Sequence, residues 1–208
     1  MKKATAILPV LFSLFVIFSG CLAAQVAGDV ARSGQKDTDV VLAQGVTPTM
    51  LQERRSIAVN INGVNSSGQY VFSVGQGNTN AGIYSDMLTK EFLKMGYQSR
   101  TITDNISESS GEEEFRALAK RGFDILLIGN MNISMTTSVT GALTGGDYAN
   151  TGVTSFTVKG IDVENGSILF ILSTEYGKAK KASEVTQDLA ELYRDVVMGR
   201  TTTTEANQ

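Results

Sequence analysis

Few side chains in this sequence could carry catalytic chemistry. Its 208 residues include no His and a single Cys, Cys21. His is the usual general base near neutral pH and the commonest metal ligand. A lone Cys has no partner for a disulfide, a Cys-x-x-Cys redox pair or a thiolate zinc site. A Ser-His-Asp triad is therefore excluded and only a Ser-Lys dyad is left open. We expect no enzyme, no bound metal and no cofactor.

Three groups of charged residues each allow a functional and a structural interpretation. Glu112–Glu114 could hold a cation, but three carboxylates at the start of a helix also stabilise the positive end of its dipole, which we prefer. Asp124, inside an apolar strand, could be a functional acid, and we interpret it as capping or pairing near the strand start. Lys178, Lys180 and Lys181 could meet an acidic partner or lipid headgroups, although a solvated turn is the simpler interpretation.

A glycine-rich segment between a predicted strand and a predicted helix suggests a dinucleotide-binding loop. It runs Gly75-Gln-Gly77-Asn-Thr-Asn-Ala-Gly82. In a Rossmann turn the glycines follow the strand directly and open the helix, whereas here about 18 residues separate the two elements. A Gly-Lys-Ser/Thr triplet, needed for a Walker A loop, does not occur either. We therefore expect a mobile loop rich in Gly and Asn and no cofactor-binding residues.

The position of the only cysteine is more informative than its chemistry. Residues 1–20 contain two Lys, an apolar stretch to Phe18 and two small residues, which is the layout of a secretory signal peptide. Phe18-Ser19-Gly20-Cys21 then resembles a bacterial lipobox, with Phe where Leu is usual. The resemblance implies cleavage before Cys21 and acylation of its sulfur and new amino group, with diacylglycerol and palmitate as the attached groups. Leu22, where Asp would mark retention at the inner membrane, implies the outer membrane.

An uncleaved membrane anchor is the main alternative for this segment. No charged residue occurs between Ala4 and Gly28, and about 20 apolar residues suffice to span a bilayer. The strongly apolar part ends near Phe18, however, which favours the shorter core of a signal peptide. Both interpretations place the rest of the chain outside the cytoplasm. Cleavage would remove two Lys and leave 16 basic against 21 acidic residues, so the sequence predicts no nucleic-acid partner.

Composition divides the remaining chain into three parts. Residues 21–50 show no sustained hydrophobic period and predict a lipidated flexible tether, with at most a short ordered piece around residues 40–42. Residues 51–200 predict one domain, large enough to bury roughly 70% of its unfolded surface. Residues 201–208 (TTTTEANQ) have nothing to bury and predict a disordered tail.

Strand and helix periods alternate within residues 51–200. Alternating or unbroken apolar residues predict strands at 56–62, 97–102, 123–129, 153–163 and 167–174. Apolar stripes predict three helices. The first covers residues 81–95, with apolar residues from Ile83 to Met95 on one face. The second runs from a Ser109 or Ser110 cap to Gly122, and the third from a Ser183 cap to Met198. Asn165-Gly166 predicts a hairpin turn. The order β-α-β-α-β-β-β-α predicts an α/β (α+β) fold, a mixed sheet with three helices packed on it.

Several of these segments resemble the curli-secretion lipoprotein family, CsgG. Arg54–Asn62 (RRSIAVNIN) is similar to its opening strand, which leads through a Gly- and Asn-rich loop into a helix. Arg121–Asn132 (RGFDILLIGNMN) is similar to its third strand, and Val158–Phe170 (VKGIDVENGSILF) to its late hairpin. The wider CsgG/PelC-like family includes an exopolysaccharide-export lipoprotein and lipoproteins that activate peptidoglycan synthases. The resemblance implies a periplasmic lipoprotein without catalysis that often assembles into rings.

The chain departs from the curli pore where that protein inserts two long hairpins into the membrane. Only eight residues, Glu175–Ala182, separate the strand 167–174 from the last helix, too few for a membrane hairpin with strands of about 9–11 residues. Residues 132–156 are long enough for one hairpin but lack an apolar lipid-facing row. We predict a polar loop there; the alternative is one short hairpin contributed to a shared barrel.

These observations together lead to one functional expectation and one alternative. We expect a periplasm-facing outer-membrane lipoprotein, held by its lipid at Cys21, that is a non-catalytic subunit of a ring-like complex for envelope export or assembly. It would be a homo-oligomer or would bind envelope machinery, without a small-molecule substrate. The alternative is a monomeric lipoprotein regulator that docks an envelope synthase or surface machine.

Overall fold

A mixed β-sheet of seven strands organises the chain, in the order β3-β2-β4-β5-β6-β1-β7. The computed structural model describes residues 35–65, 82–104, 106–137, 149–200 and 204–205. The strands are β1 (Lys36–Leu42), β2 (Ser56–Asn65), β3 (Gln98–Thr101), β4 (Ile125–Thr137), β5 (Ala149–Asp162), β6 (Ile168–Lys180) and β7 (Thr204–Glu205). The helices are α2 (Pro48–Glu53), α3 (Gly82–Lys94), α4 (Glu112–Lys120) and α6 (Ala182–Val197). Strands β3, β2 and β4 are parallel to one another, and β4, β5, β6 and β1 pair antiparallel.

The predicted fold class and element order are confirmed. From β2 to α6 the elements follow β-α-β-α-β-β-β-α, and the mixed sheet makes this an α+β fold. The predicted hairpin turn also forms between β5 and β6, where Gly166 has a φ of 71° that favours glycine. The described residues contain one helix more than the three predicted. This helix, α2, has only six residues, too few for a hydrophobic period, and starts with Pro48 behind a Thr47 side-chain cap.

The prediction of a flexible tether over residues 21–50 is wrong for its carboxyl-terminal part, which belongs to the folded domain. Residues 36–42 form β1, which pairs along its whole length with β6, and Val40 and Leu42 are buried in the core. The start of β1 is polar and exposed, so its sequence shows no alternation. At the other end of the chain, Thr204–Glu205 pairs with β1, so the predicted disordered tail joins the sheet at these two residues. The rest of the tether and of the tail lies outside the described residues.

The predicted polar loop at residues 132–156 is also wrong. β4 continues to Thr137 and β5 begins at Ala149, and the two strands pair antiparallel over this whole stretch. Only residues 138–148 of the segment lie outside the described part. The sequence hides these strands because one face of this hairpin is solvent-exposed and carries Asn, Ser and Thr, so no apolar row marks it.

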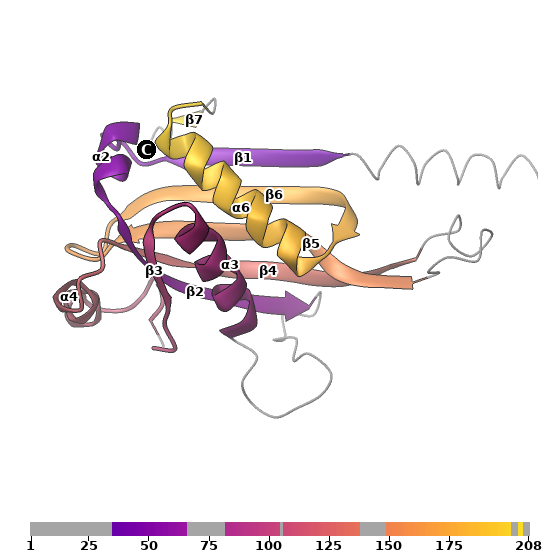
Figure 1. Cartoon of the computed structure of the whole chain (residues 1–208), viewed down its shortest axis with the longest axis horizontal. Helices are drawn as coiled ribbons and strands as arrows, with labels where there is room; N and C mark the ends of the chain where they lie inside the picture. Colours follow the sequence, from indigo (N-terminus) through magenta and orange to yellow (C-terminus); the bar gives the residue numbers. More distant parts are fainter. Residues whose placement is uncertain (1–34, 66–81, 105, 138–148, 201–203, 206–208) are drawn as a thin grey trace, which may run out of the picture.

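Two helices cover one face of the sheet and form the main core. In Figure 1, α3 and α6 lie side by side across the strands, and the space-filling view of this face shows them packed together with α2 at the end of α6. Four buried aromatic rings form the centre of this core. The ring centroids of Phe92 and Tyr97 lie 5.8 Å apart, and the centroid of Tyr193 lies 5.2 Å from that of Phe92 and 5.5 Å from that of Phe170. The two contacts of Phe92 are edge-to-face, and aromatic pairs of this kind add stability beyond the buried area.

The smaller helix α4 covers only one end of the opposite face. Its Phe115 and Leu118 pack on Leu126 of β4 and Ile161 of β5 in a second, smaller core. Glu112–Glu114 occupy the first turn of α4, as predicted, and are exposed. The helix therefore protects the beginning of β4 and leaves the other half of this sheet face without a covering element among the described residues.

Helix rotation and capping differ from the predictions in three places. α3 buries Ser85, Leu88 and Phe92, whereas Ile83 is 37% exposed. The Ser85 hydroxyl accepts from the Ile61 N–H at 2.7 Å and donates to the Ile61 carbonyl at 3.1 Å, which fixes this rotation.

Neither predicted serine cap forms, because α4 and α6 begin after Gly111 and Lys181, without a side-chain cap. Before α4 the serine hydroxyls bond locally instead. Ser110 Oγ accepts from the Ser107 N–H at 3.0 Å, and the Ser107 and Ser109 hydroxyls lie 2.9 Å apart.

Candidate interaction surface

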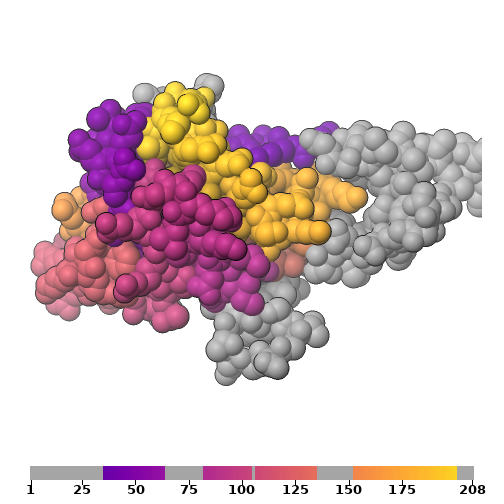
Figure 2. Space-filling model, in the orientation of Figure 1, coloured from indigo at the N-terminus to yellow at the C-terminus, as the bar shows by residue number. Residues whose placement is uncertain are grey.

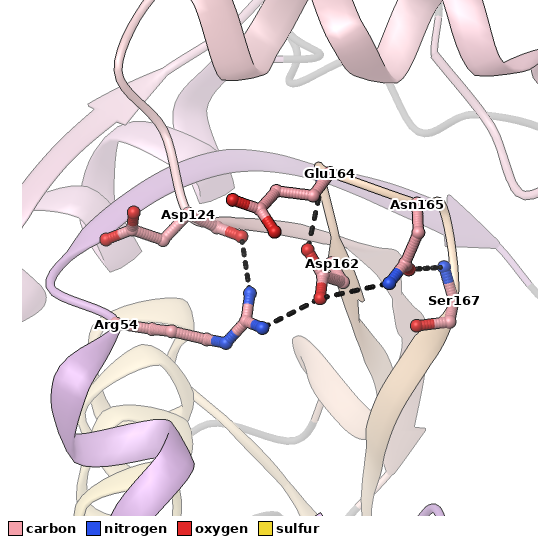
Figure 3. Close-up of polar contacts among 6 residues, drawn as sticks. All are labelled: Arg54, Asp124, Asp162, Glu164, Asn165 and Ser167. Atoms are coloured by element: carbon pink, nitrogen blue, oxygen red, sulfur yellow. Dashed lines mark hydrogen bonds and ion pairs between the residues drawn. The ribbon is translucent and has the colours of Figure 1, made fainter.

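The best-connected polar cluster of the described residues joins three loops at one end of the sheet (Figure 3). Arg54, between α2 and β2, forms an ion pair with Asp162 at the end of β5, with 2.8 Å between Nη2 and Oδ2. The Asp162 side chain is 5% exposed. Its Oδ1 also accepts the Glu164 N–H at 2.9 Å, and Asn165 Oδ1 accepts the Ser167 N–H at 2.9 Å. The cluster therefore closes the β5–β6 turn and ties it to the start of β2.

Asp124 has the structural role that the sequence predicts. Its Oδ2 accepts the N–H groups of Arg55 and Ser56 at 2.8 Å each, and its backbone carbonyl accepts from Arg54 Nη1 at 3.4 Å. A carboxylate that accepts two backbone N–H groups at a strand start satisfies donors that would otherwise lack a partner. Both carboxylates at this end thus hold backbone in place, and the arrangement offers no acid–base pair facing a cleft.

Other potentially reactive groups of the described residues are either paired or buried. One Ser-x-x-Lys spacing occurs, from Ser33 to Lys36, but Lys36 Nζ lies 3.2 Å from Asp188 Oδ2 and Ser33 lies outside the described residues. Burial raises the pKa of Tyr193, and burial together with the neighbouring Asp188 carboxylate raises the pKa of Tyr176, so both phenols stay protonated at neutral pH. Within the described ranges, no three Asp, Glu, His or Cys side chains are arranged to hold a metal ion.

The half of the sheet that α4 leaves uncovered carries a continuous array of polar side chains. Registers across five strands align Asn62, Asn130, Thr157, Ser173 and Asp39 in one row. Alternation along the strands puts the next row on the same face. We call the following residues the polar face: Asp37, Asp39, Asn62, Asn130, Asn132, Ser155, Thr157, Ser173 and Glu175. All are exposed or half-exposed.

The polar face has an ordered centre and an acidic border. At the centre Asn132 Nδ2 donates to Ser155 Oγ at 2.7 Å. At the border Asp37 of β1 stands directly opposite Glu175 of β6, and like charges in this arrangement destabilise a sheet. Among the described residues neither carboxylate has a basic group within 4.0 Å. A face of this composition is suited to bind a polar or cationic surface.

The polar face was not predicted from the sequence, although a signal for it exists. Polar residues recur two apart in its strands, as in Asn130 and Asn132 or Asp37 and Asp39. Such spacing marks one face of a strand only once the strand is recognised, and the segments that contain Asp37, Asp39 and Asn132 were predicted as tether or loop.

The remaining predicted sites have mixed outcomes. Lys178, Lys180 and Lys181 lie at the end of β6 and the start of α6, where Lys178 and Lys181 are exposed. Cys21, the signal peptide at residues 1–20 and the glycine-rich segment before Gly82 lie outside the described residues. None of the helices in the described part is long and apolar enough to cross a membrane.

Comparisons with known proteins give remote similarities in structure only. No family model and no curated protein matches the chain. The chain is similar to the PelC dodecamer from Paraburkholderia phytofirmans, with 12% identity, coverage of 78% of this chain and 97% of that one, and a TM-score of 0.43. It is also similar to the C-terminal domain of LpoB from Salmonella enterica, with 13% identity, coverage of 67% and 87%, and a TM-score of 0.34. Similarity at this level does not establish a shared family or function, so the predicted family stays a prediction.

Proposed function

We propose that this chain is a lipid-anchored protein of the cell envelope whose α+β domain is non-catalytic and assembles with other protein chains. The observation that supports assembly is the polar face, because one side of the sheet is covered by two helices and half of the other side has no covering element among the described residues. The predicted lipobox that ends at Cys21 supports the anchor.

The non-catalytic role is supported by how the charged residues are used. Asp124 and Asp162 hold backbone and Arg54 pairs with Asp162. Enzymes of acid–base type hold such groups at a cleft, within hydrogen-bond reach of a substrate atom. The polar face instead presents amide, hydroxyl and carboxylate groups over several strands, which fits recognition of a broad surface.

A ring-like homo-oligomer for envelope export or assembly is the first form that we propose for this assembly. The test is light scattering of the full-length lipoprotein after detergent extraction. We expect a closed oligomer that a Thr157→Arg substitution in the centre of the polar face disrupts. Thr49→Arg, an equally exposed position on α2, is the matched control and should leave the oligomer intact. A strict monomer at micromolar concentration refutes this form.

The second form is a monomeric regulator that docks an envelope synthase or surface machine. The polarity of the face favours it, because permanent homo-oligomers usually bury more apolar surfaces whereas reversible partners meet through polar ones. A pull-down that recovers one partner chain in a one-to-one ratio, and loses it with Thr157→Arg but not with Thr49→Arg, supports this form.

The proposed anchor has its own test. Replacement of Cys21 by Ala removes the acylated group, so we expect the chain to leave the outer-membrane fraction. Unchanged membrane partition of the Cys21→Ala chain would show that lipidation is not the anchor and would favour the uncleaved helix. This result would leave the proposals on the polar face untouched.

A further inference from the structure

The chain enters the fold at the end of the sheet that carries three lysines. Gln35 is the first described residue, and its carbonyl accepts the Gly177 N–H of β6 at 3.0 Å. Lys36 then pairs with Tyr176, so β1 leads away from this point antiparallel to β6. Figure 1 shows the start of β1 and the end of β6 on the same side of the molecule. We call the following residues, which come directly after Gly177, the lysine end: Lys178, Lys180 and Lys181.

The lysine end carries three positive charges within four residues, and it lies three residues along β6 from the acidic border that Glu175 and Asp37 form. None of its three ammonium groups has an acidic partner within 4.0 Å among the described residues. Glu184 in the first turn of α6 is the nearest acidic residue along the chain on its carboxyl side. Glu175 lies three residues back along β6, about 10 Å away at roughly 3.3 Å per residue, which is about one Debye length in 0.1 M salt.

The backbone at this end adds a further positive contribution. α6 begins two residues after β6 ends, with Lys181 as its N-cap, and the amino-terminal end of a helix carries partial positive charge. The lysines, the start of α6 and the entry of the chain thus lie together at one end of the molecule.

The length of the connection to Cys21 favours the same end for contact with a membrane. Residues 22–35 lie between Cys21 and β1, and 14 residues span at most about 50 Å when fully extended. β4, with 13 residues, is about 43 Å long at roughly 3.3 Å per residue. For the opposite end of the sheet to touch the membrane, the connection would have to run back along nearly the whole length of the sheet. Contact through the lysine end needs no such extension.

We propose that the lysine end docks on the anionic phospholipid headgroups of the membrane that holds the Cys21 anchor. This inference rests on the proposed anchor and adds an orientation, in which the β5–β6 turn with Glu164 points away from the membrane. Each lysine near an anionic surface strengthens binding by about fivefold, so the two exposed lysines together contribute about 30-fold to the docking equilibrium at low salt. The polar face is then perpendicular to the membrane plane, and partners beside the molecule can reach it.

The test uses the full-length lipoprotein, reconstituted into vesicles that carry a small fraction of headgroup-spin-labelled lipid. Because acylation occupies the sulfur of the only natural cysteine, Ser183→Cys provides a single thiol for a fluorescent probe beside the lysine end, and Glu164→Cys provides one at the opposite end. Both positions are exposed. In vesicles with 30% phosphatidylglycerol in phosphatidylcholine we expect quenching of the probe at position 183 and little at position 164.

The quenching at position 183 should depend on charge. We expect it to fall in pure phosphatidylcholine, in 0.5 M salt, and in a Lys178→Gln/Lys181→Gln variant whose docking equilibrium is about 30-fold weaker. Lys90→Gln/Lys120→Gln, which removes two lysines elsewhere on the domain, is the matched control and should change little. Equal quenching at positions 183 and 164, or quenching at 183 that ignores lipid charge and both lysines, overturns the inference while the anchor stands. If the protein does not float with the vesicles and Cys21 itself takes the probe, the anchor fails and the inference fails with it.

Discussion

Gly160 in β5 should tolerate no side chain, because a Phe170 ring occupies the space where its Cβ would stand. Gly160 pairs with Phe170 across the β5–β6 ladder. A Cβ built at this position would lie 2.2 Å, 2.3 Å and 2.7 Å from three atoms of the ring, whereas carbon atoms in contact normally lie about 3.5–4.0 Å apart. Gly160→Ala therefore requires the ring to move by more than 1 Å.

The surroundings of Phe170 determine what this movement costs. The ring is fully buried, and Tyr193, itself fully buried, lies 5.5 Å from it. A close-packed core has no space to receive the displaced ring, and overpacked positions typically lose about 1–3 kcal/mol. We expect Gly160→Ala to lower the free energy of unfolding by about 3 kcal/mol, the upper end of this range, which corresponds to a fall of about 6–12 °C in Tm for a chain of this size.

A double-mutant cycle tests the stated cause. Phe170→Leu alone should cost about 1–2 kcal/mol through lost packing. In the Gly160→Ala/Phe170→Leu chain the new methyl group enters space that the ring has vacated, so the double variant should lose about 2 kcal/mol less than the sum of the single variants. The assay is urea unfolding followed by far-UV circular dichroism. Gly82→Ala, at the start of α3 where the nearest non-neighbouring side-chain atom of the described part of the chain, Asp86 Oδ2, lies 3.9 Å from the added Cβ, is the control and should be neutral or slightly stabilising. Costs that add within about 0.5 kcal/mol, or a Gly160→Ala cost below about 1 kcal/mol, would refute the steric explanation.

Three further variants test the polar contacts in the same unfolding assay. Arg54→Met leaves the buried Asp162 carboxylate without its ion pair, so we expect a loss of about 2–4 kcal/mol that Asp162→Asn in the same chain partly restores; no recovery would contradict the pairing. Asp124→Asn weakens two 2.8 Å bonds from backbone N–H groups and should cost about 1–2 kcal/mol, whereas a neutral result would deny it the role of holding the start of β2. Tyr176 has a raised pKa in the fold, from burial first and then from Asp188, so its contribution to stability is complete below pH 10, the ordinary tyrosine value, and falls as the pH rises above it. Tyr176→Phe should therefore make unfolding less pH-dependent between about pH 10 and 11, and identical slopes for the two chains would argue against a raised pKa of Tyr176.

The parts of the fold that could be predicted from the sequence are those whose signals are local. The apolar run from Ile125 to Ile128 is buried on both faces and identifies the central strand by itself, and Gly166 specifies its turn through its own φ. β1 could not be found in this way, because its first half is polar and its place in the sheet depends on its partner β6. Ser85 is a similar case, since a serine is buried in α3 only because Ile61 offers it backbone groups from a distant strand.

The candidate surface shows the same division. The lysine end was visible as a cluster because Lys178, Lys180 and Lys181 are close in sequence, and the lipidation of Cys21 stays a prediction that rests on its immediate neighbours. The polar face draws one or two residues from each of five strands, such as Asn62 and Asp39, and becomes a surface only through the sheet order. A sequence pattern can predict each strand, but strand order depends on tertiary packing and is not contained in any one segment.

The pairing of β1 with β6 also determines how the domain would bear mechanical load. If the chain is held at Cys21, a force along β1 enters the domain near Lys36, the first residue of that strand. The hydrogen bonds of an antiparallel ladder stand perpendicular to the strands, so the pull shears all the bonds between β1 and β6 at once and does not open them one after another. The ion pair between Lys36 and Asp188 adds a link from this point to α6. A domain attached in this way resists a force from its anchor with the whole ladder between β1 and β6.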